Sequence, residues 1–222
     1  MRRLLLVIVL LAPVQLVAQT PEEETLHIAR IQYDGGGDWY DSPSAIPNLV
    51  TFTREQFPIA LASGQQVVRL DRDMLGRYPM LFLTGHGSVT FRDTELAALR
   101  RYLEQGGFLW VDDDYGLDPS IRPLLNELFP DRELQTVPPD HSIYRTPFGF
   151  ESGRPPKVHE HDGGDPEGLG LFVDGRLAVL YTYESNPSDG WAYDEHENPQ
   201  EIVDTALRFG TNVLVYVFTS IE

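Results

Sequence analysis

The chain has 222 residues, 41% of them hydrophobic and 11% aromatic, which is enough for one buried core and argues against intrinsic disorder. Its 34 acidic and 17 basic residues give a formal net charge of −17, which argues against nucleic acid and anionic membrane surfaces as partners. The absence of cysteine excludes a thiolate nucleophile, a cysteine-ligated zinc site and a lipid anchor on an N-terminal cysteine.

The first 18 residues have the pattern of an export signal. Two arginines follow Met1, residues 4–11 form an unbroken apolar run, and Ala18 is a small residue suited to cleavage. The apolar run is shorter than the roughly 20 residues that a membrane-spanning helix needs. We therefore expect cleavage after Ala18 and export to the periplasm or the extracellular space, with an uncleaved anchor as the alternative. Residues 19–25 would be a linker, and residues 26–222 one domain without a stable membrane span.

Beyond the linker, apolar runs alternate with segments of helical periodicity. Strands are expected at residues 26–33, 65–70, 79–84 and 108–111, and helices at residues 47–55, 93–105 and 118–129. A hairpin over residues 171–183, a helix over residues 202–209 ended by Gly210, and a closing strand over residues 212–218 complete the pattern. This alternation predicts a doubly wound, mostly parallel α/β sheet with helices on both faces and a late hairpin. Residues 131–166 form a long excursion without clear elements, and such loops are usually functional.

Three polar clusters, residues 84–88, 111–116 and 158–162, each follow an apolar run. Loops beyond the carboxyl ends of strands are where open α/β sheets bind ligands. We therefore expect the three clusters to converge on one crevice.

The last of these clusters offers metal ligands. His159 and His161 would lie on one face of an extended segment, with Asp162 adjacent, and could bind a divalent ion such as zinc. The candidates for a further ligand from elsewhere in the chain are His86, Asp112, Asp113 and His141. The alternative is a solvated loop whose histidines bond to backbone carbonyls.

The second cluster places three carboxylates, residues 112–114, just past a buried strand. In a crevice their pKa values would rise, so that His86, Asp112 or Asp113 could act as a catalytic acid or base. The carboxylates could instead bind a cation or sugar hydroxyls. The alternative is a role in turns and helix capping.

A glycine-rich segment follows the first strand. The backbone amides of Gly35, Gly36 and Gly37 could bind an oxyanion or a phosphate, although no P-loop pattern accompanies them. Trp39 in this segment could stack on a sugar ring, as could Trp191. The alternative is that these aromatic rings pack their loops against the body of the protein.

Several motifs resemble a known family, namely residues 33–40 (YDGGGDWY), 43–49 (PSAIPNL), 85–87 (GHG), 106–109 (GGFL), 112–116 (DDDYG) and 159–162 (HEHD). Together they resemble the bacterial domain of unknown function 4159 family over nearly all of the expected mature chain. That family is similar to a branch of the class I glutamine amidotransferase-like superfamily, related to trehalose-utilisation-type proteins. Residues 140–143 (DHSI) resemble a His-Pro-Ile element of the latter group, with serine in place of proline.

The resemblance implies a fold and an exported location rather than a reaction. Glutaminases of that superfamily use a nucleophilic cysteine, which this chain lacks. Our leading hypothesis is a binding or regulatory module of the cell envelope for a small polar, carbohydrate- or peptide-derived ligand. The residues expected to bind it are Gly35, Gly36, Gly37, Asp38, Trp39, His86 and His141. One alternative is a metal-assisted hydrolase that uses the His/Asp cluster, and another is a structural partner of envelope proteins.

Overall fold

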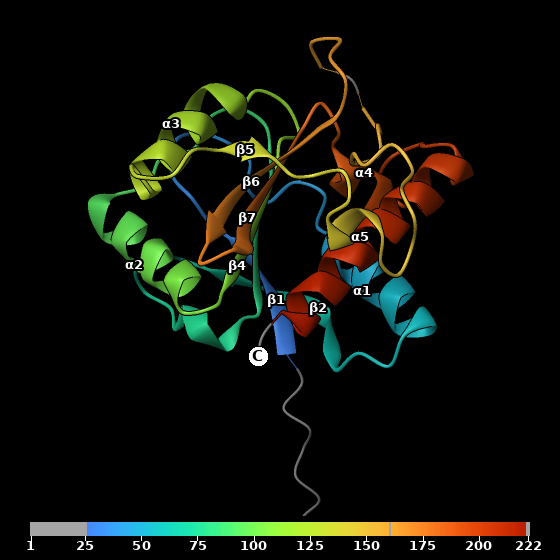
Figure 1. The fold of residues 1–222 in the computed structure, drawn as a ribbon, viewed down its shortest axis with the longest axis horizontal. Helices are drawn as coiled ribbons and strands as arrows, with labels where there is room; N and C mark the ends of the chain where they lie inside the picture. Colours follow the sequence, from blue (N-terminus) through green and yellow to red (C-terminus); the bar gives the residue numbers. More distant parts are fainter. Residues whose placement is uncertain (1–25, 160, 221–222) are drawn as a thin grey trace, which may run out of the picture.

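The computed structural model describes residues 26–159 and 161–220, which form one seven-stranded sheet in the order β2-β1-β3-β4-β7-β6-β5 (Figure 1). The parallel strands are β1 (Leu26–Ile31), β2 (Leu61–Val68), β3 (Met80–Leu83), β4 (Phe108–Asp112) and β7 (Arg176–Tyr183). Strand β6 (Glu167–Val173) is antiparallel to β7 and to the short strand β5 (Gln135–Thr136). The expected late hairpin is therefore present as β6 and β7.

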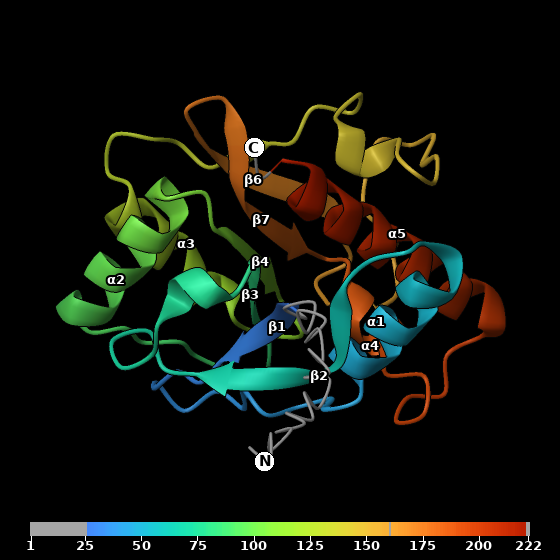
Figure 2. The ribbon, with the colours of Figure 1, turned by 90° about the horizontal axis from the view of Figure 1, so that it is seen from below.

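Helices cover both faces of the sheet (Figure 2). One face carries α2 (Asp93–Glu104) and α3 (Asp118–Leu128). The other carries α1 (Ala45–Gln56), the short helix α4 (Pro187–Trp191) and α5 (Gln200–Thr219). Two 3-10 turns lie in the connections, η1 (Leu75–Arg77) and η2 (Ser142–Tyr144). This arrangement confirms the predicted doubly wound, mostly parallel α/β fold.

The central strand β3 is apolar along its whole length because both faces of the sheet are buried there. In β3, Leu81 and Leu83 pack into the core beneath α2 and α3, while Met80 and Phe82 pack into the core beneath α1 and α5. The alternation of side chains along a strand thus supplies both cores from one short segment.

The strand order places a switch point between β1 and β3 at the carboxyl edge of the sheet. Strand β1 pairs with β2 on one side and with β3 on the other, so the chain changes direction across β1. In open α/β sheets, loops diverge at such a switch point and leave room for a ligand at the carboxyl ends of the strands. The carboxyl ends of β1, β3, β4 and β7 all point to this edge, at the top of Figure 1.

The predicted closing strand over residues 212–218 is wrong, because this segment is the second half of α5. Its run of valines and aromatic residues favours a strand locally, but its buried residues Val213, Leu214 and Val217 continue the helical spacing of the first half. Gly210 does not end the helix. A Cβ atom there would lie 2.5 Å from Leu49 Cδ1, so Gly210 instead allows α5 to approach α1 closely.

Two segments for which the sequence predicts no helix or strand contain short elements in the structure. The excursion over residues 131–166 contains β5 and η2, and the polar stretch after β7 contains α4. The proposed export signal and the whole of the proposed linker lie outside the described residues. Within residues 26–159 and 161–220, no helix combines the length and the apolar character needed to cross a membrane.

Candidate functional site

Acidic and imidazole side chains from four strand ends gather at the carboxyl edge of the sheet. We call this group the acid–imidazole cluster, and its members are Asp38, Asp41, His86, Asp114, His159, Asp189 and His196. The loop after β1 carries Asp38 and Asp41, the loop after β3 carries His86, and the loop after β4 carries Asp114. The segment before β6 carries His159, α4 carries Asp189, and the connection between α4 and α5 carries His196. The three clusters predicted from the sequence therefore each contribute to one site.

His86 lies at the switch point between β1 and β3. Its Nδ1 atom is 3.1 Å from Asp38 Oδ2 and 3.3 Å from Asp114 Oδ2, and its backbone N–H donates to Asp38 Oδ1. Burial lowers the pKa of His86, but the charges of Asp114 and Asp38 outweigh it, so the pKa is raised. A glycine must precede His86, because Gly85 has φ +133° and a Cβ atom there would lie 2.8 Å from Asp38 Oδ1.

Two buried carboxylates lie at the end of β4, and one of them, Asp114, contacts His86 from below. Asp114 is 5% exposed and accepts a hydrogen bond of 2.6 Å from Asn186 Nδ2. Burial, and then the charge of Asp189, raise the pKa of Asp114 to about 7. Asp112 is fully buried, and its pKa is likewise raised to about 7 by burial, although the Ser188 backbone N–H donates to it at 2.8 Å.

Asp113 has a structural role in the folded chain. Its carboxylate accepts hydrogen bonds from the backbone N–H groups of Leu117 and Asp118, at 3.0 and 3.1 Å, and from the Tyr181 hydroxyl. The two N–H groups lie at the start of α3, where backbone N–H groups lack helical partners. For Asp113 the structure thus favours the capping alternative.

A second part of the cluster surrounds Asp189, which is 2% exposed. The Nδ1 atom of His159 lies 2.6 Å from Asp189 Oδ2, and the Nε2 atom of His196 lies 3.5 Å from Asp189 Oδ1. His196 Nε2 is also 2.9 Å from the Ser42 hydroxyl, which in turn donates to Asp41 Oδ2 at 2.8 Å. The hydrogen bond to Asp189 raises the pKa of His159.

Arg30 holds the loop that carries Asp38 and Asp41. Its buried guanidinium donates to the backbone carbonyls of Trp39, Asp41 and Ser42. Burial lowers the pKa of Arg30 to about 10, which leaves it charged at neutral pH. A buried cation thus fixes the acidic loop from below.

The backbone around the cluster is strained. Three non-glycine residues have positive φ angles there, namely Ser42 at 47°, Glu184 at 52° and Asn186 at 49°. Such conformations persist where the surrounding structure imposes them, and they are frequent at functional sites. Here Ser42 contacts Asp41 and His196, while Asn186 holds Asp114.

The site is open to solvent above its buried floor. The side chains of His86, His159 and His196 are 49%, 42% and 30% exposed. A separate hollow of about 410 Å³ lies between the β2–β3 connection and α2. It is lined by residues outside the acid–imidazole cluster, among them Arg72, Met74 and Arg101. Half-exposed imidazoles above buried carboxylates can offer both donors and acceptors to a ligand.

The glycine segment does not present all its amides to a ligand. The Gly37 N–H donates to the Ser88 carbonyl at 3.0 Å, and a Cβ atom at Gly37 would lie 2.7 Å from the His86 carbonyl oxygen. Gly35 and Gly36 have positive φ angles, which form the turn that leads to Asp38. These glycines therefore bring the loop close to residues 86–88.

The two tryptophans differ in position. Trp39 is partly buried and packs against the core on the α2 and α3 face. Trp191 is fully buried and lies 4.8 Å, between ring centroids, from Trp110. Sugar stacking on Trp191 is therefore wrong, because its ring belongs to the core.

His161 and Asp162 face a different neighbourhood from His159. The His161 ring packs edge-on against Tyr115, with centroids 5.3 Å apart, and Asp162 accepts a hydrogen bond from the Tyr183 hydroxyl. Within the described residues, two groups of three acidic and imidazole side chains have ligand atoms that all lie within 4.8 Å of one another. They are Asp38, Asp41 and His86, and Asp41, Asp189 and His196, so neither group contains His159, His161 or Asp162.

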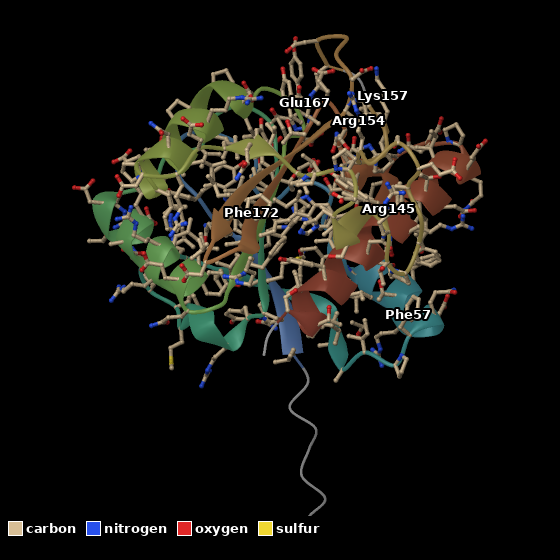
Figure 3. The ribbon with its side chains drawn as sticks, viewed as in Figure 1. Phe57, Arg145, Arg154, Lys157, Glu167 and Phe172 are labelled. Carbon is tan, nitrogen blue, oxygen red and sulfur yellow. The ribbon has the colours of Figure 1, made fainter. Side chains whose placement is uncertain are left out.

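His141 lies away from the cluster. Its ring is 5.1 Å from that of Tyr216, near the end of α5, and 6.2 Å from that of Phe172. Phe172 lies at the hairpin end of β6, whereas Glu167 at the other end pairs with Tyr183 beside the site (Figure 3). The expectation that His141 joins the crevice is therefore wrong, because it lies at the opposite edge of the sheet.

Sequence reasoning missed Asp41, Asp189, Asn186 and His196 as site residues. The same strand-end rule that indicates His86 would have indicated Asn186 and Asp189, because they follow β7. Asp41 and His196 have no comparable local signal, since neither directly follows a strand and only the folded chain brings them together.

The fold and the cluster define an α/β protein with an acidic, solvent-accessible site at the switch point of a doubly wound sheet. Over residues 27–218 the chain matches the family described as "Domain of unknown function (DUF4159)", and it belongs to that family. Comparison with the curated proteins gives no match.

Proposed function

We propose that this chain is an exported cell-envelope protein that binds a small polar ligand at the acid–imidazole cluster. The observation that carries this proposal is the position of His86, which contacts Asp38 and Asp114 across the ends of β1, β3 and β4. Open α/β sheets bind ligands at this place. A buried carboxylate beneath a half-exposed imidazole has little structural purpose there, since burying charge costs stability.

The charge of the cluster limits the chemistry of the ligand. Its four carboxylates are hydrogen-bond acceptors when ionised, and one of the nearby amides, that of Gly37, is already bonded. Phosphate and other anions would be repelled by these carboxylates. A neutral or amine-bearing ligand with several hydroxyl or ammonium donors, derived from a carbohydrate or a peptide, fits better.

The export signal in the first 18 residues supports a location in the cell envelope. We further propose that the chain is a relative of the amidotransferase-like superfamily that has kept the crevice of that fold without its thiol chemistry. The support is the doubly wound sheet together with the absence of cysteine from the sequence.

A panel of probe compounds tests the proposal by thermal unfolding. Glucosamine, N-acetylglucosamine, glucose and alanyl-lysine would each be added to the purified protein, with inorganic phosphate as the anionic probe. A ligand at 100 times its Kd stabilises a protein by about 2.7 kcal/mol, which would raise the Tm by several degrees. We expect at least one organic probe, and not phosphate, to do so.

The matched variants are His86→Ala and His141→Ala. His86→Ala should abolish the rise in Tm, whereas His141→Ala should keep it, because His141 lies at the opposite edge of the sheet. A panel without any stabilising probe, or an undiminished rise in His86→Ala, would overturn the proposal.

A further inference from the structure

We propose that Asp41, Asp189 and His196 bind one divalent metal ion of the zinc type, through a carboxylate oxygen of each aspartate and Nε2 of the histidine. This site goes beyond the proposed ligand binding because it assigns a metal ion to the part of the cluster around Asp189, and it shares only Asp41 with the group that contains His86. It also differs from the set His159, His161 and Asp162 that the sequence indicates.

The three side chains already have the spacing of a coordination shell. Their ligand atoms all lie within 4.8 Å of one another, and His196 Nε2 is 3.5 Å from Asp189 Oδ1. Zinc binds imidazole nitrogen and carboxylate oxygen at about 2.0–2.2 Å, so two ligands of a tetrahedral ion lie about 3.4 Å apart. Small side-chain movements are therefore enough to close the shell.

A second observation points independently to a cation. Asp189 is 2% exposed, and its buried Oδ1 atom has no hydrogen-bond donor among residues 26–159 and 161–220. A buried carboxylate oxygen without a donor is costly, and such atoms are rare in folded proteins. The oxygen faces His196 and Asp41, where a metal ion would supply the missing positive charge.

The protons of the described neighbouring side chains do not satisfy this oxygen. The Ser42 hydroxyl donates its proton to Asp41 Oδ2, so the 2.9 Å contact between Ser42 and His196 requires the proton of Nε2. His196 Nε2 then directs its proton to Ser42 rather than to Asp189. A divalent ion that replaces this proton would contact all three ligand atoms at once.

The surroundings hold the ligands in place. His159 Nδ1 lies 2.6 Å from the other oxygen of Asp189, an outer-shell contact of the kind that orients metal-binding carboxylates. Arg30 donates to the backbone carbonyl of Asp41. The backbone N–H of His196 donates to the Ala192 carbonyl at 3.0 Å, which fixes it to the turn after α4.

The ligand set also indicates which metal ion would bind and how many coordination positions the protein would leave open. One imidazole and two carboxylates suit zinc or manganese better than calcium or magnesium, which prefer oxygen ligands alone. Three protein ligands leave a fourth position open, and the His196 side chain is 30% exposed, so water can reach that position.

Metal titration tests this site. The protein, purified without a polyhistidine tag and dialysed against a chelator, would be titrated with Zn²⁺ by calorimetry. We expect one ion per chain. Asp189→Asn and His196→Ala should each weaken zinc binding at least 10-fold. Of the two substitutions, His196→Ala should disturb the fold less, because the His196 side chain is partly exposed. Circular dichroism would show that each variant is folded.

A double variant, His161→Ala with Asp162→Asn, is the matched control and should bind Zn²⁺ as the wild type does. The anomalous signal of zinc in a crystal would then locate the ion. A peak between Asp41, Asp189 and His196 supports the proposal. The proposal would be overturned if the wild type bound no zinc or if His196→Ala bound it unchanged. It would also be overturned if only the double variant lost binding or if the anomalous peak lay at His86. The zinc titration measures the metal site without any probe compound, so its failure is distinguishable from failure of the ligand panel.

Discussion

The Nδ1 atom of His86 lies 3.3 Å from the Oδ2 atom of Asp114 and joins the ends of two neighbouring parallel strands, β3 and β4. The imidazole is half-exposed and the carboxylate is 5% exposed, so the pair connects solvent to the buried floor of the site. Each group affects the protonation of the other. Asp114 favours the charged form of His86, and His86 favours the charged form of Asp114.

Asp114→Asn should lower the pKa of His86. The substitution removes the closest buried negative charge but keeps an oxygen that can accept the hydrogen bond from Asn186. In the wild type the raised pKa of His86 stabilises the fold below the unfolded pKa of histidine, and this contribution is lost as the pH rises through the folded pKa. NMR titration of the imidazole measures the change. His141, whose pKa is lowered by burial, is the internal control and should titrate unchanged.

Asp112→Asn should make the stability of the protein less dependent on pH between about 4 and 7. The folded pKa of Asp112 is about 7, above the unfolded value, so the folded state binds more protons in this window and stability falls as the pH rises. One such group contributes up to about 1.4 kcal/mol per pH unit. Urea unfolding at pH 5, 6 and 7 measures the slope. Equal slopes for the variant and the wild type would contradict burial of an ionisable Asp112.

Arg30→Met should destabilise the fold by about 3 kcal/mol and abolish ligand binding, because three carbonyls of the loop over residues 39–42 lose their donor. The control is Arg69→Met, which removes an ion pair with the 60% exposed Asp34 and should cost less than about 1 kcal/mol. Chemical denaturation gives both values. Similar losses in the two variants would argue against an anchoring role for Arg30.

Asp113→Ala should destabilise the protein by about 1–3 kcal/mol and leave ligand binding intact at a temperature where the variant is folded. Its carboxylate caps the start of α3 and has no contact with His86, so the loss is one of helix capping and a buried hydrogen bond. Calorimetric unfolding and the probe panel measure the two effects separately. A variant of normal stability that no longer binds would instead place Asp113 in the site.

The sequence predicts most of this fold because strands buried on both faces appear as continuous apolar runs, as in β3 and β4. The rule that ligands bind beyond strand ends also indicates His86 and the carboxylates that follow β4. The second half of α5 is mispredicted because its β-branched residues favour a strand until packing against α1 and α4 is known.

The remaining site residues depend on tertiary structure. Asp41 and His196 are far apart in the chain. They lie near each other because Arg30 holds the loop after β1 and the Ser42 hydroxyl contacts both side chains. The sequence around His141 resembles a family motif, but nothing in it indicates at which edge of the sheet His141 lies. Its ring lies beside Phe172, so the direction of β6 determines that edge.

The most direct measurement of ligand binding at the cluster is an NMR titration of the six histidine side chains. The titrant would be glucosamine, or the panel compound that raises the Tm most. We expect the imidazole signals of His86, His159 and His196 to shift together with a single Kd, while those of His27 and His141 stay in place. Shifts confined to His27 or His141, or no shift at His86 on saturation, would contradict a binding site at the carboxyl edge of the sheet.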